Sequence, residues 1–272
     1  MEYPKPSKAS SLITLILIVV GFVAGLIGAL AGLGGGIIIT PVLALHFGVP
    51  IRVAIGTSLV AVITTSVASS AVHLQRHTTD IRLGMTLELA TALGAAITAY
   101  FAGYVNRGVL EVLFAAFLLY AAISLLRGKG GDEGAPVIRS SEIPEYTPKN
   151  YPLGLGSSLV AGGLSGLLGI GGGPIKVPVM YLFMEVPLIV ATATSNFMIG
   201  VTAASSGFVY FRRGDILASL AAPLGVGVFA GSLLGARLAP RVHAKYVIYL
   251  LVVVMFYLSG NMLVHFYREF LR

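Results

Sequence analysis

The stretch GLGGGIIITP at residues 32–41 recurs as GIGGGPIKVP at residues 169–178, which is 137 positions further along the chain. Each copy follows an apolar run and contains glycines and a proline, residues that interrupt a regular helix. Two interrupted apolar segments at corresponding places in the halves of a membrane chain indicate the binding site of a transporter. The repeat therefore predicts breaks in two membrane helices.

The composition is that of a membrane protein. The 272 residues are 56% hydrophobic and 11% charged, whereas soluble domains carry about 25% charged residues. The net charge of +7 comes from Lys and Arg scattered singly between apolar runs, as at the ends of membrane spans. We therefore expect contact with the lipid bilayer and no nucleic-acid partner. The absence of cysteine rules out disulfides and thiolate metal sites.

The hydropathy pattern predicts an all-α polytopic membrane protein with two homologous repeats, broken or re-entrant short helices and about 8–10 membrane segments. The first transmembrane repeat spans 12–127 and the second 151–267. Residues 128–150 between them are rich in Gly, Pro, Ser and charge, as expected of a linker loop. Residues 9–51 are uncharged and, as one helix, would be about twice as long as the hydrocarbon core is thick, so they turn back at the glycines.

The two repeats align beyond the glycines. The same offset pairs Thr57-Ser58 with Thr194-Ser195 and Arg76 with Arg213. After a gap of two residues, the alignment pairs Asp80-Ile81 with Asp215-Ile216. Polar residues that match at one register predict a duplication, because general apolar similarity would not place them.

The distribution of Lys and Arg gives a prediction of topology. Eight full spans, with the glycine segments re-entrant, place most of these residues on the side that holds both termini, whereas ten spans divide them almost evenly. The positive-inside rule therefore favours eight spans and two halves of parallel orientation. Inverted repeats, which are common in transporters, are the alternative.

The glycine triplets are the first candidates for substrate binding. Where a helix breaks inside a membrane, backbone N–H groups lose their partners, and the positive end of the following half-helix favours an anion. The alternative is close helix packing, which we expect for Gly227, Gly231 and Gly235 at four-residue spacing. The recurrence at one register favours binding for the triplets Gly34, Gly35, Gly36, Gly171, Gly172 and Gly173.

Polar residues beside the triplets complete the predicted substrate site. Lys176 stands where the first copy has Ile39, and it either attracts an anion or snorkels to the membrane surface. Hydroxyl and amide groups begin the spans after each triplet, where they either bind oxyanions or sodium or bond the helix backbone. These residues are Thr57, Ser58, Thr194, Ser195 and Asn196.

The remaining ionisable residues have simpler interpretations. Glu88 and Glu185 are candidate proton relays, but an interfacial position is the stronger expectation for both. His46 is expected to be a lone polar histidine. Asp80 and Asp215 precede spans as N-caps, and Arg76 and Arg213 are expected to anchor the ends of their spans.

The chain contains no nucleophile elbow, no phosphate-binding loop and no His-Glu-x-x-His motif. The glycine triplets follow no predicted strand, so they are not dinucleotide fingerprints. We therefore expect no enzymatic activity, no catalytic residue, no cofactor and no metal site.

These motifs give the chain a clear resemblance to a known family. The first triplet and Pro41 are preceded by the run Ala24-Gly25-Leu26-Ile27-Gly28. The second triplet and Pro178 are preceded by the run Gly162-Gly163-Leu164-Ser165-Gly166. Together with Thr57-Ser58 and Thr194-Ser195-Asn196, this pattern resembles the sulfite exporter TauE/SafE family of membrane transporters, over about residues 12–266.

The resemblance implies a multi-pass protein of the prokaryotic cytoplasmic membrane that moves small sulfur-containing or organic anions, such as sulfite, thiosulfate and the sulfonate sulfoacetate. We expect alternating access, with proton coupling open. The alternatives are a cation or metal-ion transporter, which the scarcity of intramembrane carboxylates disfavours, and a non-transporting membrane scaffold. The oligomeric state stays open, with a homodimer as one option.

Overall fold

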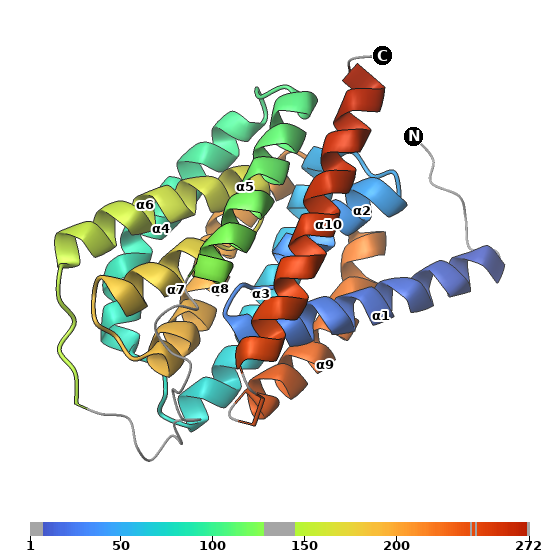
Figure 1. Ribbon diagram of the computed structural model, residues 1–272. Helices are drawn as coiled ribbons and strands as arrows, with labels where there is room; N and C mark the ends of the chain where they lie inside the picture. The colour runs from blue at the N-terminus through green and yellow to red at the C-terminus, as the bar shows by residue number, and fades with distance from the viewer. Residues whose placement is uncertain (1–7, 128–144, 240, 243, 271–272) are drawn as a thin grey trace.

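A computed structural model describes residues 8–127, 145–239, 241–242 and 244–270. These residues form helices and turns, with no strand among them, so the predicted all-α class is confirmed. The helices shown in Figure 1 are α1 (Lys8–Ala31), α2 (Gly36–His46), α3 (Ile51–Gln75), α4 (Ile81–Ala102), α5 (Arg107–Arg127), α6 (Tyr151–Leu168), α7 (Gly173–Leu182), α8 (Leu188–Arg212), α9 (Ala218–Leu238) and α10 (Ala244–Phe270).

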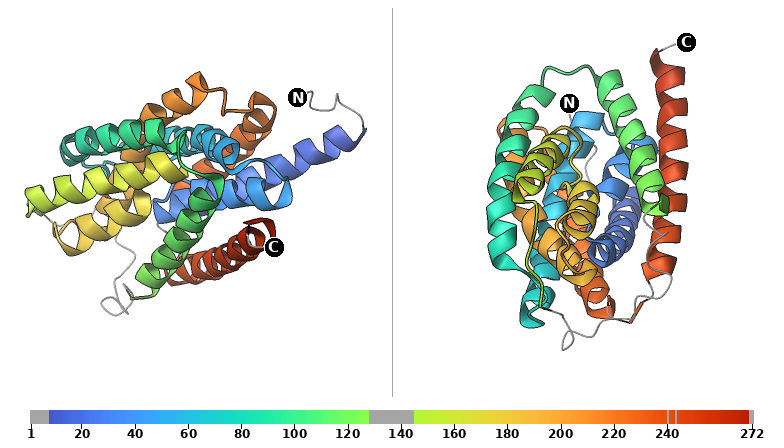
Figure 2. Two further views of the ribbon diagram at one scale, coloured as in Figure 1. Left: turned by 90° about the horizontal axis from the view of Figure 1, so that it is seen from above. Right: turned by 60° about the vertical axis from the view of Figure 1, so that its left-hand side comes forward.

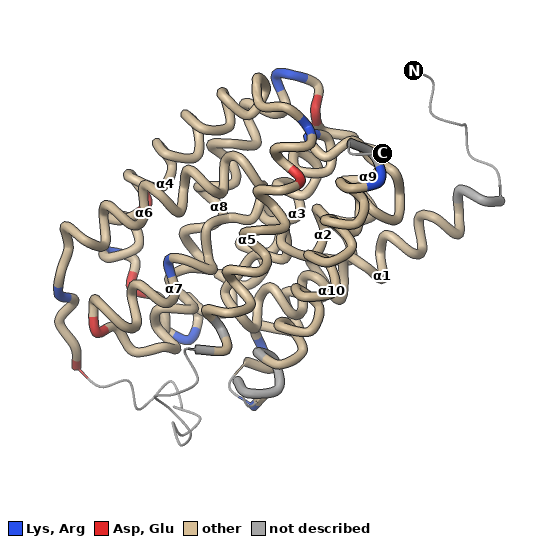
Figure 3. Tube along the Cα trace, turned by 45° about the horizontal axis from the view of Figure 1, so that its top comes forward, with Lys and Arg blue, Asp and Glu red and all other residues tan. Residues whose placement is uncertain are grey.

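Seven of the helices in the described part of the chain are long and apolar enough to cross a membrane. They are α1, α3, α4, α5, α8, α9 and α10. Charged residues gather mainly at the turns and helix ends, as Figure 3 shows. This distribution suits a bundle whose middle lies in lipid, because a charge facing hydrocarbon is costly.

Helices of the second half begin 137 residues after their counterparts in the first half. The pairs of first residues are 36 and 173, 51 and 188, 81 and 218, and 107 and 244. Left-handed backbone positions recur at the same spacing, including Gly48 with Glu185 and His77 with Gly214. The duplication stays a prediction from the sequence, and these spacings support it.

The predicted gap of two residues before Asp215 is wrong. Helix α4 has Asp80 as its N-cap, and the Asp80 carboxylate accepts the Leu83 N–H at 2.9 Å. The N-cap of α9 is Leu217, again 137 residues later. Asp215 lies two residues before that cap and instead pairs with Arg213, whose Nε is 2.9 Å from the Asp215 Oδ2. The Asp-Ile pair at residues 215–216 therefore resembles residues 80–81 in sequence but does not occupy the equivalent structural position.

The two halves are interleaved. Helices α3 and α8 pack together in the core, and each of them packs against a helix of the other half, α9 on α3 and α4 on α8. Figure 2 shows helices of the two halves, distinguished by colour, next to one another in both views. The most extensive helix packing is between α1 and α9 and between α6 and α4. Gly227, Gly231 and Gly235 of α9 meet backbone carbonyls of Ile18, Phe22 and Leu26, which confirms their predicted packing role.

Contacts between helices show their directions. From α4 to α8, Asp80 bonds Thr194 and Glu88 bonds Thr202, so these two helices run in parallel. Between the central helices, Leu59 faces Gly207 and Ser66 bonds Asn196, so α3 and α8 are antiparallel. Leu217 at the start of α9 bonds Thr57 of α3, and Gly225 further along α9 faces Thr64, so α3 and α9 also run in parallel.

Helix α1 runs in the same direction as α9 and α3, because Gly21 faces Leu224 and Gly235 faces Leu26. Helix α2 therefore returns the chain, and α1 and α6 approach the centre from opposite sides (Figure 1). The two halves are inverted, so the expectation of parallel halves is wrong. Eight full spans with re-entrant short segments require α1 and α3 to run in opposite directions, which the packing contradicts.

Candidate functional site

The two glycine breaks meet beside the midpoints of the central helices. Residues 32–35 separate α1 from α2, and residues 169–172 separate α6 from α7. A Cβ on Gly34 would lie 3.1 Å from Val62 Cγ1, and one on Gly171 would lie 3.0 Å from the same atom. Ile199 of α8 flanks both glycines from the other side. The breaks therefore share one buried location at the centre of the bundle.

Glycine is required at these breaks. Gly34 and Gly35 have φ values of 80° and 73°, and Gly171 and Gly172 have 80° and 75°. Such left-handed backbone disfavours any residue with a Cβ. The next position in each copy is crowded by the other break, because Gly36 faces the Gly169 carbonyl and Gly173 the Gly32 carbonyl. The triplets are thus explained by backbone geometry and by mutual contact.

The backbone N–H groups at the two breaks lie near one another and lack hydrogen-bond partners. Within the described residues, the N–H groups of the two triplets donate no hydrogen bond, although all six glycines are buried. The first N–H groups of a helix have no partner within the helix, and neither Gly35 nor Gly172 provides a side-chain cap. The amino-terminal ends of α2 and α7, which are the positive ends of their helix dipoles, therefore lie together at one buried place.

The predicted Thr and Ser residues hold this geometry. Thr194 Oγ1 accepts the Asp80 N–H at 2.9 Å, and Thr57 Oγ1 accepts the Leu217 N–H at 3.2 Å. The hydroxyls of Ser58 and Ser195 donate across the bundle to Gly169 O at 3.2 Å and Gly32 O at 3.0 Å. Each of these side chains thus fixes a break or the start of a helix of the other half.

Asn196 bonds the last turn of α1, just before the first break. Its Nδ2 donates to Ala29 O at 3.1 Å, while its buried Oδ1 has no partner among the described residues. Ser58, Ser195 and Asn196 bond a break or the helix end beside it, whereas Thr57 and Thr194 bond the starts of helices. Apart from the hydrogen bond that Thr40 Oγ1 donates to Ser58 Oγ at 2.8 Å, the partners of these five side chains are backbone groups. Their role as substrate ligands stays a prediction.

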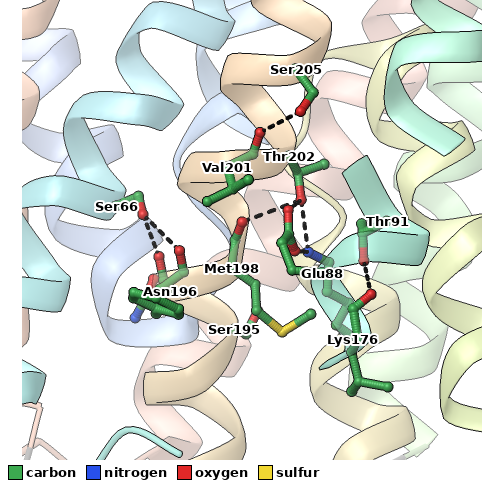
Figure 4. Close-up of polar contacts among 12 residues, drawn as sticks. Ser66, Glu88, Thr91, Lys176, Ser195, Asn196, Met198, Val201, Thr202 and Ser205 are labelled. Carbon is green, nitrogen blue, oxygen red and sulfur yellow. Dashed lines mark hydrogen bonds and ion pairs between the residues drawn. The ribbon is translucent and has the colours of Figure 1, made fainter. Parts of the chain in front are cut away.

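A buried ionic cluster lies beside the second break (Figure 4). Lys176 Nζ is 3.2 Å from Glu88 Oε2 and 3.0 Å from Thr202 Oγ1. The Thr202 hydroxyl donates to Glu88 Oε1 at 2.6 Å. The side chains of Lys176 and Glu88 are 0% and 4% exposed. Lysine, carboxylate and hydroxyl thus converge from α7, α4 and α8 into one closed network.

This cluster corrects two expectations. Of the two interpretations of Lys176, snorkelling is wrong, because its ammonium is fully covered. Glu88 is buried against side chains of α7 and α8 rather than exposed at the end of its span. Position along a helix suggested an interface for Glu88, but the burial of a side chain depends on which neighbour covers its face. Glu185 is exposed as expected, with its Oε2 2.8 Å from Lys149 Nζ, and His46 is exposed at the end of α2.

The cluster exists in one half only. At the positions 137 residues away, Lys176 corresponds to Ile39, Glu88 to Gly225 and Thr202 to Thr65. The Thr65 hydroxyl donates only to Ala61 O of its own helix, at 3.1 Å. The two breaks therefore have matching backbones but unequal surroundings, one ionic and the other apolar.

The two arginines that were expected to anchor span ends contact helix ends of the other half. Arg76 donates to Ala236 O of α9 at 2.9 Å, and Arg213 donates to Ala99 O of α4 at 2.8 Å. Cations at the carboxyl end of a helix satisfy its last carbonyls and favour its dipole. These contacts join the halves.

Apolar helices interrupted at a shared central site define a polytopic membrane transporter. Comparison with known proteins supports this class. The match to the family described as Sulfite exporter TauE/SafE covers residues 17–262, and the chain belongs to that family. The resemblance predicted from the glycine motifs is thereby confirmed.

Relatives with curated names have the same general description. The chain is 32% identical over 256 residues to the probable membrane transporter protein YunE of Bacillus subtilis, covering 89% of this chain and 94% of the relative. It is 26% identical over 250 residues to a probable membrane transporter protein of Methanocaldococcus jannaschii, covering 85% and 88%. No solved structure matches the chain.

Proposed function

We propose that this transporter moves small sulfur-containing or organic anions, such as sulfite, thiosulfate and sulfonates including sulfoacetate. The observation that carries this proposal is the meeting of two helix starts whose buried N–H groups lack partners. Such groups, with the positive ends of the helix dipoles, favour an oxyanion. The sulfonate and sulfite groups present several acceptor oxygens to a set of N–H donors.

Lys176 supplies the full positive charge near this site. Its side chain passes against the second break, because a Cβ on Gly172 would lie 3.1 Å from Lys176 Cε. Glu88 balances that charge in the present arrangement. An anion that approaches the breaks would therefore compete with Glu88 for the ammonium group.

Alternating access is the mechanism that the inverted halves support. Two halves of opposite direction can exchange their outward and inward arrangements around a fixed central site. The hairpins α1–α2 and α6–α7 are the elements that approach the site from opposite sides (Figure 1). We place the transporter in the prokaryotic cytoplasmic membrane, in agreement with bacterial and archaeal relatives.

The test is flux of sulfite and sulfoacetate in proteoliposomes that contain the full chain. Gly172→Leu places a bulky side chain at the second break, and Lys176→Ala removes the charge, so both variants are expected to lose most of the flux. Gly156→Ala is a matched control, because a Cβ at Gly156 meets no atom within 4 Å. Undiminished flux in both site variants would refute the proposed site, and no flux in the unaltered chain would refute the substrate class.

A further inference from the structure

We propose that Glu88 is the proton-binding residue of this transporter, and that its protonation frees the Lys176 ammonium to hold the anion. The inference rests on the proposed anion transport and adds its coupling ion and the residue that carries it. It begins from the cluster of Glu88, Lys176 and Thr202, in which one carboxylate neutralises one ammonium inside the bundle.

Charge balance links the proton to the anion. The buried pair is neutral as it stands, so an added anion would leave one uncompensated negative charge in a dry region, at considerable electrostatic cost. One proton on the Glu88 carboxylate removes that charge. Entry of one monovalent anion together with one proton therefore keeps the centre neutral, and the departure of both restores the pair.

The Thr202 hydroxyl allows the change without a broken network. In the present arrangement, its Oγ1 donates to Glu88 Oε1 and lies 3.3 Å from Met198 O. When Glu88 takes up a proton from water, the Thr202 hydroxyl can turn its hydrogen to Met198 O and accept the new carboxyl hydrogen. The Lys176 ammonium has three donors, and only Glu88 and Thr202 receive them among the described residues.

Few other charges face this carboxylate. Helix α6, which packs on α4, contains no Asp, Glu, Lys, Arg or His. Helix α8 contributes only Arg212 at its far end, α7 contributes only Lys176, and α4 itself adds Arg82 near its start. The protonation of Glu88 is therefore governed mainly by Lys176 and by what binds Lys176.

Binding of methanesulfonate, a sulfonate with a single negative charge, to the purified full chain, measured from pH 5 to pH 8, tests this coupling. The sulfonate group stays ionised over this range, so a change of affinity reports the protein. If binding takes up one proton, affinity should rise as pH falls, by at most about ten-fold per pH unit. Glu88→Gln resembles the protonated carboxyl group, so its affinity should not vary with pH, and a pH gradient should no longer drive accumulation in proteoliposomes.

Glu185→Gln is the control, because Glu185 is an exposed carboxylate paired with Lys149, away from the cluster. It should keep the pH dependence of the unaltered chain. The same slope in Glu88→Gln would overturn the inference while leaving anion transport intact. If Glu88→Gln fails to fold, Glu88→Asp should move the midpoint of the pH profile, and an unmoved midpoint would overturn the inference. No binding by the unaltered chain at any pH would instead overturn the proposed function.

Discussion

Replacing Lys176 by Met should strongly destabilise the protein unless Glu88 is neutralised as well. Methionine fills a similar volume, so the change removes the charge without leaving a large cavity. It leaves a carboxylate that is 4% exposed with one remaining close donor, Thr202 at 2.6 Å. Removing one partner of a buried ion pair costs about 3–5 kcal/mol, whereas replacing both partners by neutral groups is often nearly neutral.

The double variant Lys176→Met/Glu88→Gln should therefore recover most of the lost stability, with a coupling free energy of about 3 kcal/mol. The chain contains no tryptophan, so unfolding is best followed by circular dichroism of the helices. One kcal/mol corresponds to roughly 2–4 °C in Tm for chains of about 150–250 residues. The single variant should then unfold at least about 6 °C below the unaltered protein.

Lowering the pH should reduce this deficit, because protonation of Glu88 removes the unpaired charge. The comparison is made at pH 8 and pH 5 on the single variant, the double variant and the unaltered chain. A double variant as unstable as the single one, or a single variant whose deficit is below about 1 kcal/mol, would show that the pair does not behave as a buried ion pair. The reasoning would then be refuted.

Three further changes have defined outcomes. Thr202→Val should lower the free energy of unfolding by about 1–3 kcal/mol, because Lys176 and Glu88 both lose their hydrogen bond to the Thr202 hydroxyl. Thr65→Val, at the counterpart position, should cost less in the same thermal melt, because the Thr65 hydroxyl bonds only Ala61 O. Gly172→Ala should lower the free energy of unfolding by at least about 1–2 kcal/mol, because Gly172 has a φ of 75°. Gly156→Ala in helix α6 should be neutral or stabilising, and equal Tm values for the two variants would contradict the assigned backbone strain. Burial and a 2.7 Å hydrogen bond to Asp80 raise the pKa of Tyr146 above its usual value of about 10. The unaltered chain should therefore be more stable than Tyr146→Phe by about 1 kcal/mol below pH 10, and this difference should shrink above pH 10, as measured by denaturation at several pH values.

The breaks could be predicted from the sequence because they depend on local chemistry. A left-handed backbone requires glycine, so Gly34, Gly35, Gly171 and Gly172 reveal their geometry through their identity alone. Their recurrence at one offset then placed the two breaks at corresponding positions. The packing of Gly231 and its neighbours was likewise readable from their regular spacing.

The partner of Lys176 could not be predicted in the same way. Glu88 is 88 residues away in sequence, and the two charges meet because α4 and α7 both pack on α8. A signal did exist, because both residues lack a charged counterpart in the other half. The two-residue gap does not change this signal, because Glu88 falls opposite an uncharged residue in either alignment, Pro223 with the gap and Gly225 without it.

The prediction of parallel halves was wrong for a different reason. The positive-inside rule depends on an unequal distribution of Lys and Arg, and inverted halves tend to equalise that distribution. The direction of α1 was decided instead by its small residues, such as Gly21, which fit the backbone of α9. Shape complementarity between distant segments is not visible in a count of charges.

The interleaving of the halves has a consequence for biosynthesis. Helix α1 is synthesised long before its main partner, α9, leaves the ribosome. Helix α4 likewise waits for α6. The nascent chain must therefore remain in the membrane, with the small-residue faces of α1 unpacked, until α9 has been synthesised. Chaperoning by the insertion machinery, and rapid degradation of chains that end after α5, are the expected results of this late closure.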